Sequence, residues 1–141
     1  MNDPYDLKRF ADMHRIDYGT ALSEIKRGKK RTHWMWYIFP QVRGLGRTGT
    51  SWKFGISSLD EAAAFLADPY LGGNLREICE ALLLLETDNA AEVFEADKKK
   101  LRSSMTLFVC VAGEDSVFQR VLDKFFGGKG DNQTKRILNL T

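Results

Sequence analysis

The stretch Leu75–Glu86, LREICEALLLLE, is the clearest guide to the fold of this 141-residue chain. Its apolar residues recur every three or four positions, which places them on one face of an α-helix. The same spacing recurs in residues 7–25, 101–112 and 117–125. No stretch alternates between apolar and polar residues around an Asn-Gly or Asp-Gly turn, the pattern typical of a β-hairpin. We therefore expect an all-α fold, a single-domain orthogonal bundle of six to eight helices.

Polar residues predict where two of the helices begin. Asp3-Pro4 has the form of an N-cap followed by proline at the first helical position. Ser58 and Glu61 stand three residues apart, as in a capping box, ahead of an alanine-rich helix over residues 59–67.

Glycines predict where helices stop, because glycine readily adopts the left-handed backbone conformation that often follows a helix. On this basis Gly28 ends the first helix, and Gly72-Gly73 breaks a short turn that begins at Asp68-Pro69. Residues 29–56 are the least regular part of the chain. Within them the apolar stretch Trp34–Phe39 is compatible with a short buried helix or a strand.

The composition is that of a folded protein, and we treat residues 1–141 as one helical domain. Hydrophobic residues make up 43% of the chain and charged residues 28%, a balance that argues against disorder. Cys79 and Cys110 lie in apolar helical sequence without metal-ligand spacing, so we expect two buried reduced thiols, no metal and no cofactor. The polar N-terminus is unlike a signal peptide, and the longest apolar run, Ala81–Leu85, is too short to span a membrane. A cytoplasmic protein with no membrane partner is the expectation.

The segment His33–Gln41, HWMWYIFPQ, has the most unusual composition. Five of its first seven residues are aromatic or imidazole, where a core helix normally carries leucine, isoleucine and valine. Aromatic faces stack against planar ligands. His33 stands beside basic residues that would lower its pKa, so it could serve as a neutral base or hydrogen-bond donor. Four residues are expected to be packing residues: Trp34, Met35, Tyr37 and Ile38. For His33, Trp36 and Gln41, packing and ligand binding both remain open.

Two further segments carry groups suited to an anionic ligand. Gly44-Leu45-Gly46-Arg47-Thr48 is either a plain turn or a loop whose backbone N–H groups hold a phosphate. It lacks the GxGxxG pattern and preceding strand of a dinucleotide fold. Lys100 and Ser103 flank the inner face of a helix, as the polar wall of a pocket or as small-residue packing.

These segments resemble the bacterial family called domain of unknown function 1810. The resemblance rests on His33–Gln41 with Gly44-Leu45-Gly46, on Tyr70-Leu71-Gly72 and on Lys100–Phe108, and it extends over nearly the whole chain. It implies a small, cytoplasmic, mostly helical domain and no defined activity. A fainter likeness, in helical architecture and size, is to the YbiA-like proteins. Those proteins act on N-glycosidic bonds of ribose-linked compounds, including ADP-ribose conjugates.

Two hypotheses of function follow. The first is a domain that binds or hydrolyses a small nucleotide-like or ADP-ribose-like ligand, in a pocket formed by residues 33–47 and the helix start at 100–106. His33 is then the candidate catalytic residue, and the ligand-binding candidates are Trp36, Gln41, Gly44, Gly46, Arg47, Lys100 and Ser103. The alternative is a non-catalytic module that binds nucleic acid or a protein through a basic face. Nucleic acid is the less favoured partner, because the net charge is only +2, and the oligomeric state is left open.

Overall fold

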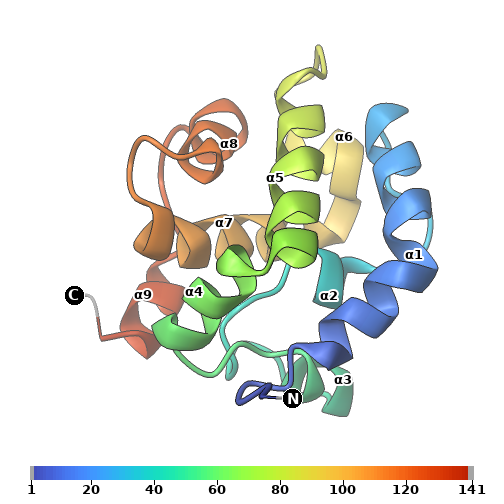
Figure 1. The fold of residues 1–141 in the computed structure, drawn as a ribbon. Coiled ribbons are helices and arrows are strands. Elements are labelled where there is room, and N and C mark those ends of the chain that lie inside the picture. The colour runs from blue at the N-terminus through green and yellow to red at the C-terminus, as the bar shows by residue number, and fades with distance from the viewer. Residues whose placement is uncertain (1, 140–141) are drawn as a thin grey trace.

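A computed structural model describes residues 2–139, in which the long helices cross one another around a shared core (Figure 1). Within this range the chain has no β-strand, and eight of its α-helices contain five residues or more. The expected all-α fold of six to eight helices is therefore confirmed. The α-helices are α1 (Lys8–Lys26), α2 (Met35–Ile38), α3 (Gly49–Lys53), α4 (Leu59–Ala67), α5 (Pro69–Leu83), α6 (Ala90–Phe94), α7 (Lys98–Ala112), α8 (Val117–Phe126) and α9 (Asn132–Ile137), and the 3-10 turn η1 (Glu95–Asp97) joins α6 to α7.

The first helix starts at Lys8, so the expectation that Pro4 is its first residue was wrong. Asp3 nevertheless acts on the helix, because its carboxylate accepts hydrogen bonds from the backbone N–H groups of Leu7 (2.8 Å) and Lys8 (3.1 Å). These are donors that a helix leaves unpaired at its start. A turn that includes Asp6, at a positive φ of 51°, brings the carboxylate back to them.

The end of α1 agrees with the sequence. Gly28 has a positive φ of 84°, and its N–H donates to the carbonyl oxygen of Ile25 at 2.8 Å. The next N–H, of Lys29, donates to the carbonyl oxygen of Glu24 at 3.1 Å. This pair of bonds is the Schellman arrangement, which pairs carbonyl groups that the helix end would otherwise leave free.

Helix α4 has the predicted bounds, but only half of the predicted capping box forms. The Ser58 hydroxyl accepts from the N–H of Glu61 at 3.1 Å. The Glu61 carboxylate binds Ser57 instead of completing the box, and it also pairs with Arg9 at 2.6 Å. Glu61 thus joins the start of α4 to α1.

Helix α5 runs through Gly72-Gly73, so the predicted break there was wrong. Asp68 caps the helix by accepting from the N–H groups of Tyr70 and Leu71, and Pro69 occupies its first position. A Cβ atom on Gly72 would lie 2.1 Å from the carbonyl oxygen of Leu66. The glycine therefore permits a close approach of α5 to the end of α4, a tertiary reason that helix propensity does not reveal.

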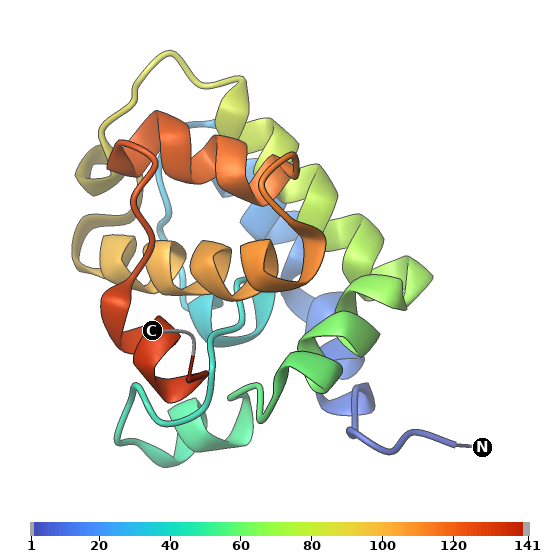
Figure 2. The same ribbon diagram turned by 90° about the vertical axis from the view of Figure 1, so that its left-hand side faces the viewer.

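A chain of four phenylalanine rings passes through the core. Phe10 of α1 meets Phe65 of α4 at 5.2 Å between ring centroids. Phe65 meets Phe108 of α7 at 5.6 Å, and Phe108 meets Phe118 of α8 at the same distance. All four rings are buried. In Figure 2, α7 crosses the middle of the molecule and α8 lies above it, so α7 is the central helix.

The two cysteines differ in exposure. Cys79 is buried in α5, as expected, whereas Cys110 of α7 is exposed, so the expectation of two buried thiols was wrong for Cys110. It stands two residues after the buried Phe108, about 200° further round the helix, and so faces outward. No helix within residues 2–139 is long and apolar enough to cross a membrane.

Candidate functional site

The carboxylate of Glu24, near the end of α1, organises the backbone that leads into the aromatic segment. Its Oε1 atom accepts from the N–H groups of Arg31 (2.7 Å) and Thr32 (3.0 Å) and from the indole Nε1–H of Trp34 (2.9 Å). Its Oε2 atom accepts from the Thr32 hydroxyl at 2.6 Å. The side chain is buried, which would raise its pKa, but these hydrogen bonds outweigh burial and lower the pKa of Glu24 to about 2. The carboxylate is thus ionised and fixes residues 31–34 against α1.

In helix α2, three residues of the aromatic segment are buried and one, Trp36, is half-buried. The four expected packing residues are all buried, with Trp34 at 1% and Ile38 at 0% exposure. The carbonyl oxygen of Tyr37 accepts from Nε2 of the buried His14 at 2.8 Å, and its hydroxyl donates to the carboxylate of Asp17. Trp36 is the exception, because its ring is only partly covered.

A hollow of about 230 Å³ lies beside Trp36, between α2, α3 and the start of α7. Trp36 and Lys100 form part of its wall, and His33 stands at its exposed rim. The remaining wall residues are Lys30, Trp34, Met35, Tyr37, Thr50 and Asp97. We call this hollow the Trp36 pocket.

Two lysines share one carboxylate in the Trp36 pocket, and each lies near an indole ring. The Nζ atom of Lys100 is 2.8 Å from Asp97 and 4.5 Å from the centroid of the Trp36 ring. The Nζ atom of Lys30 is 3.0 Å from Asp97 and 5.2 Å from the Trp34 ring. Partial burial would raise the pKa of Asp97, but hydrogen bonds from both ammonium groups lower it. The three side chains together carry one net positive charge, and they combine cations with aromatic faces.

The comparisons with known proteins fit this arrangement of helices. The sequence profile of a family described as "Protein of unknown function (DUF1810)" matches residues 4–138. The chain belongs to the DUF1810 family. A crystal structure of a conserved hypothetical protein from Mycobacterium tuberculosis, Rv1873, is similar to this DUF1810 protein, with a TM-score of 0.93 and 40% sequence identity. The match covers 99% of this chain and 100% of that one. A search of curated proteins returned no match.

The structure brings only some of the predicted site residues of this DUF1810 protein together. His33, Trp36 and Lys100 line the Trp36 pocket. Gly46 lies close to the edge of the Trp36 ring but does not line the pocket. A Cβ atom on it would be 2.6 Å from the Ser51 side chain and 3.3 Å from the indole Cη2 atom.

Four other predicted site residues do not line the pocket. Gln41 is buried, and its Nε2 atom has no hydrogen-bond partner among the described residues. Ser103 is buried and its hydroxyl donates to the carbonyl oxygen of Lys99, four residues earlier. Gly44 faces Ile137 of α9, and Arg47 is exposed. Ser103 therefore lies on the core-facing side of α7, and its hydroxyl is hydrogen-bonded within that helix.

Lys30 and Asp97 are the residues that sequence reasoning missed as parts of this site. Lys30 was not among the predicted site residues, although its side chain is only 9% exposed. Asp97 precedes Lys100 by three residues, the spacing of an ion pair on one helical face. That spacing was the available signal, and nothing local indicated that Lys30 would join the pair.

Three basic residues that could contribute to an interaction face each contact a different side chain of this protein. Lys29 forms an ion pair with Glu95 at 3.2 Å, and Lys30 forms one with Asp97 at 3.0 Å. Arg43 stacks on Trp52 of α3, 4.6 Å from its ring centroid. In the described part of the chain, no group of three or more histidine, cysteine or acidic side chains could hold a metal ion.

Proposed function

We propose that the Trp36 pocket binds a small ligand that joins a planar ring to an anionic group, with a mononucleotide as the simplest example. The observation that carries this proposal is the position of the Lys100 ammonium over the Trp36 ring, beside a second lysine. An aromatic face suits a nucleobase, and the two lysines suit a phosphate. A base that stacks on Trp36 would replace the Lys100 ammonium there and leave it free to pair with the phosphate.

The size of the pocket limits the ligand. Its volume of about 230 Å³ is below the range of roughly 300–1,000 Å³ that is common for drug-sized ligands. A second hollow, of about 290 Å³, shares Lys30, His33 and Asp97 with it and extends toward Glu95. A mononucleotide would thus occupy the Trp36 pocket, and ADP-ribose would have to extend past His33 into the second hollow.

Hydrolysis of an N-glycosidic bond in such a ligand would need a proton donor or acceptor. His33 is the residue placed for it, because it lies at the boundary of both hollows and its side chain is exposed. Binding and hydrolysis are therefore separate parts of the proposal. Hydrolysis is measured as the release of the free nucleobase from the same ligands.

The binding experiment is a titration of AMP, adenosine, ribose 5-phosphate and ADP-ribose, followed by melting temperature and tryptophan fluorescence. We expect AMP to stabilise the protein more than adenosine or ribose 5-phosphate, because adenosine lacks the phosphate and ribose 5-phosphate lacks the ring. The Trp36→Ala and Lys100→Met variants should lose this response. Trp52→Ala is the matched control, because Trp52 is exposed and stacks on an arginine outside the pocket. An AMP response that persists in Trp36→Ala, or no response to any of the four compounds, would show that the proposal is wrong.

The alternative, an interaction module with a basic face, has weaker support, because Lys29 and Lys30 are committed to carboxylates within the chain. It requires binding to a nucleic acid or an acidic protein that weakens steeply with added salt. Lys26→Met and Arg31→Met, both at exposed positions, would then reduce binding without altering the AMP response.

A further inference from the structure

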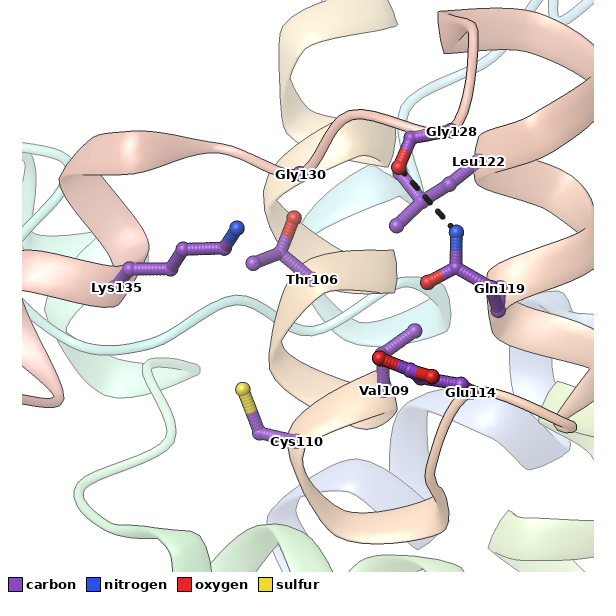
Figure 3. A pocket seen from close by; sticks show the side chains of 9 residues that line it. All are labelled: Thr106, Val109, Cys110, Glu114, Gln119, Leu122, Gly128, Gly130 and Lys135. Atoms are coloured by element: carbon purple, nitrogen blue, oxygen red, sulfur yellow. Dashed lines mark hydrogen bonds between the residues drawn. The ribbon is translucent and has the colours of Figure 1, made fainter. Parts of the chain in front are cut away.

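A second cavity, of about 390 Å³, lies between α7, α8 and α9 and shares no lining residue with the Trp36 pocket. Figure 3 shows it from close by. Its volume is within the range of small-molecule sites. The lining residues are Thr106, Val109, Cys110, Glu114, Gln119, Leu122, Gly128, Gly130 and Lys135.

The carboxamide of Gln119 presents a fixed hydrogen-bond acceptor to this cavity. Its Nε2 atom donates to Oδ1 of Asp123 at 3.0 Å and to the carbonyl oxygen of Gly128 at 3.3 Å. Both partners only accept hydrogen bonds, so the nitrogen must face them. The Oε1 atom consequently faces the other way, toward the cavity, as Figure 3 shows. It is set for a ligand that donates a hydrogen bond.

Two opposite charges reach the cavity from different elements. Glu114 comes from the loop between α7 and α8, and Lys135 comes from α9 on the other side (Figure 3). Neither side chain forms an ion pair within the described part of the chain. Apolar surface from Val109 and Leu122 contributes to the wall. The cavity is therefore acidic and accepting on one side and cationic on the other.

The wall near Lys135 is held in place by hydrogen bonds. The Thr106 hydroxyl accepts from the N–H of Asp131 at 2.8 Å and donates to the carbonyl oxygen of Arg102 at 2.7 Å. These bonds fasten the segment between α8 and α9 to α7. Gly130 lies against the same hydroxyl, since a Cβ atom on it would be only 3.0 Å away. The wall on the Lys135 side of the cavity is thus fixed by hydrogen bonds, which favours binding without rearrangement there.

We propose that this cavity binds a small zwitterion, whose ammonium group faces Gln119 and Glu114 and whose carboxylate faces Lys135. A ligand with both charges forms charge-assisted hydrogen bonds on both sides of the cavity, whereas a ligand with one charge forms them on one side only. The hydrocarbon part of the ligand lies on Val109 and Leu122. This site is independent of the proposed function of the Trp36 pocket.

Cys110 supplies a built-in reporter of occupancy. It lines the cavity and is exposed, whereas Cys79 is buried, so alkylation of the folded protein selects Cys110. Partial burial raises the pKa of the Cys110 thiol, and the charge of Lys135 opposes this rise. The reaction is therefore followed at mildly alkaline pH, where more of the thiol is ionised. For each variant, the alkylation rate with the compound is compared with the rate of the same variant without it.

The experiment measures the rate of Cys110 alkylation by iodoacetamide and the melting temperature of the full chain. The probes are 6-aminohexanoate, a mixture of the amino acids other than cysteine, and two single-charge analogues, hexanoate and hexylamine. Cysteine is left out because its thiol would itself consume iodoacetamide. We expect at least one zwitterionic probe to slow alkylation and raise the melting temperature, and both analogues to be about tenfold weaker. Glu114→Gln and Lys135→Met should each weaken that protection by a similar factor.

Two neighbouring variants are the matched controls, because their side chains are exposed and do not line the cavity. They are Asp115→Asn and Lys129→Met, and both should protect Cys110 as wild type does. The proposal is wrong if neither zwitterionic probe changes either readout. It is also wrong if hexanoate and hexylamine act as strongly as the zwitterion, or if Glu114→Gln and Lys135→Met retain full protection.

Discussion

The indole N–H of Trp34 donates a 2.9 Å hydrogen bond to the carboxylate of Glu24, ten residues earlier in the chain. Both side chains are buried. The bond connects α1 to the start of the aromatic segment, so that Trp34 points inward and Trp36, two residues on, borders the pocket. The position of the candidate site therefore depends on a carboxylate outside it.

Replacement of Glu24 by alanine should destabilise the protein by about 3 kcal/mol or more, because several buried donors would lose their charged acceptor. Glu24→Gln should cost less, because an amide oxygen can still accept. Urea unfolding provides the measurement. Glu80→Ala is the control, since Glu80 forms only an exposed pair with Arg120 and should change stability by less than about 1 kcal/mol. Equal effects of Glu24→Ala and Glu80→Ala would contradict this role.

The stability that Glu24 contributes should disappear in acid. Its pKa is about 2 in the folded protein, compared with an ordinary value of 4.5, so the unfolded chain takes up the proton first as the pH falls. The contribution is complete above about pH 4.5 and is lost as the pH approaches 2. The difference in unfolding free energy between wild type and Glu24→Gln should shrink over this interval. A difference that stays constant down to pH 2 would show that the carboxylate is not the stabilising group.

His14 should remain neutral in the folded protein below the pH at which an ordinary histidine is protonated. Burial lowers its pKa, Nε2 donates to the carbonyl oxygen of Tyr37 at 2.8 Å, and Nδ1 lies 3.0 Å from the amide nitrogen of Asn74. Protonation of Nδ1 would require the Asn74 amide to turn. Because the unfolded state binds the proton more readily, His14 should favour folding above about pH 6.5 and reduce stability below it. NMR titration of the ring protons tests this, and a midpoint at or above 6.5 would contradict it.

The adjacent glycines of α5 should respond in opposite ways to alanine. In Gly72→Ala the new Cβ would lie 2.1 Å from the Leu66 carbonyl oxygen, so α4 and α5 must separate and the protein should lose about 1–3 kcal/mol or more. In Gly73→Ala the new Cβ meets nothing within 4 Å, so the substitution should stabilise the helix by roughly 0.5–1 kcal/mol. Melting temperatures of the two variants provide the test. A stabilised Gly72→Ala would mean that the two helices do not approach so closely.

Local sequence patterns were sufficient for most of the helices. The bounds of α4 and the stop of α1 at Gly28 follow from residues that lie three or four positions apart, and the periodic residues 117–125 lie within α8. Two expectations failed for different reasons. Gly72 lies within α5, where its missing side chain leaves room for the carbonyl of Leu66. Cys110 is exposed because it lies on the face of α7 opposite the buried Phe108.

The candidate site was only partly predictable. The composition of residues 33–41 indicated Trp36 as a candidate ligand-binding residue, and the polar start of α7 indicated Lys100. The paths of the loops and the packing of α7 bring these two residues together. They also bring Lys30 to Asp97, which pairs with Lys100 as well.

By itself, the sequence determined the helical class, some of the helix ends and the segment in which to look for a site. Helix formation depends on hydrogen bonds and side-chain contacts within about four residues, and such contacts leave a readable spacing. Only the tertiary structure decided that Glu24 anchors Trp34, that Gln41 and Ser103 are buried, and that Glu114 and Lys135 flank one cavity. Those relationships join residues far apart in the chain, and the packing of buried side chains between helices sets them.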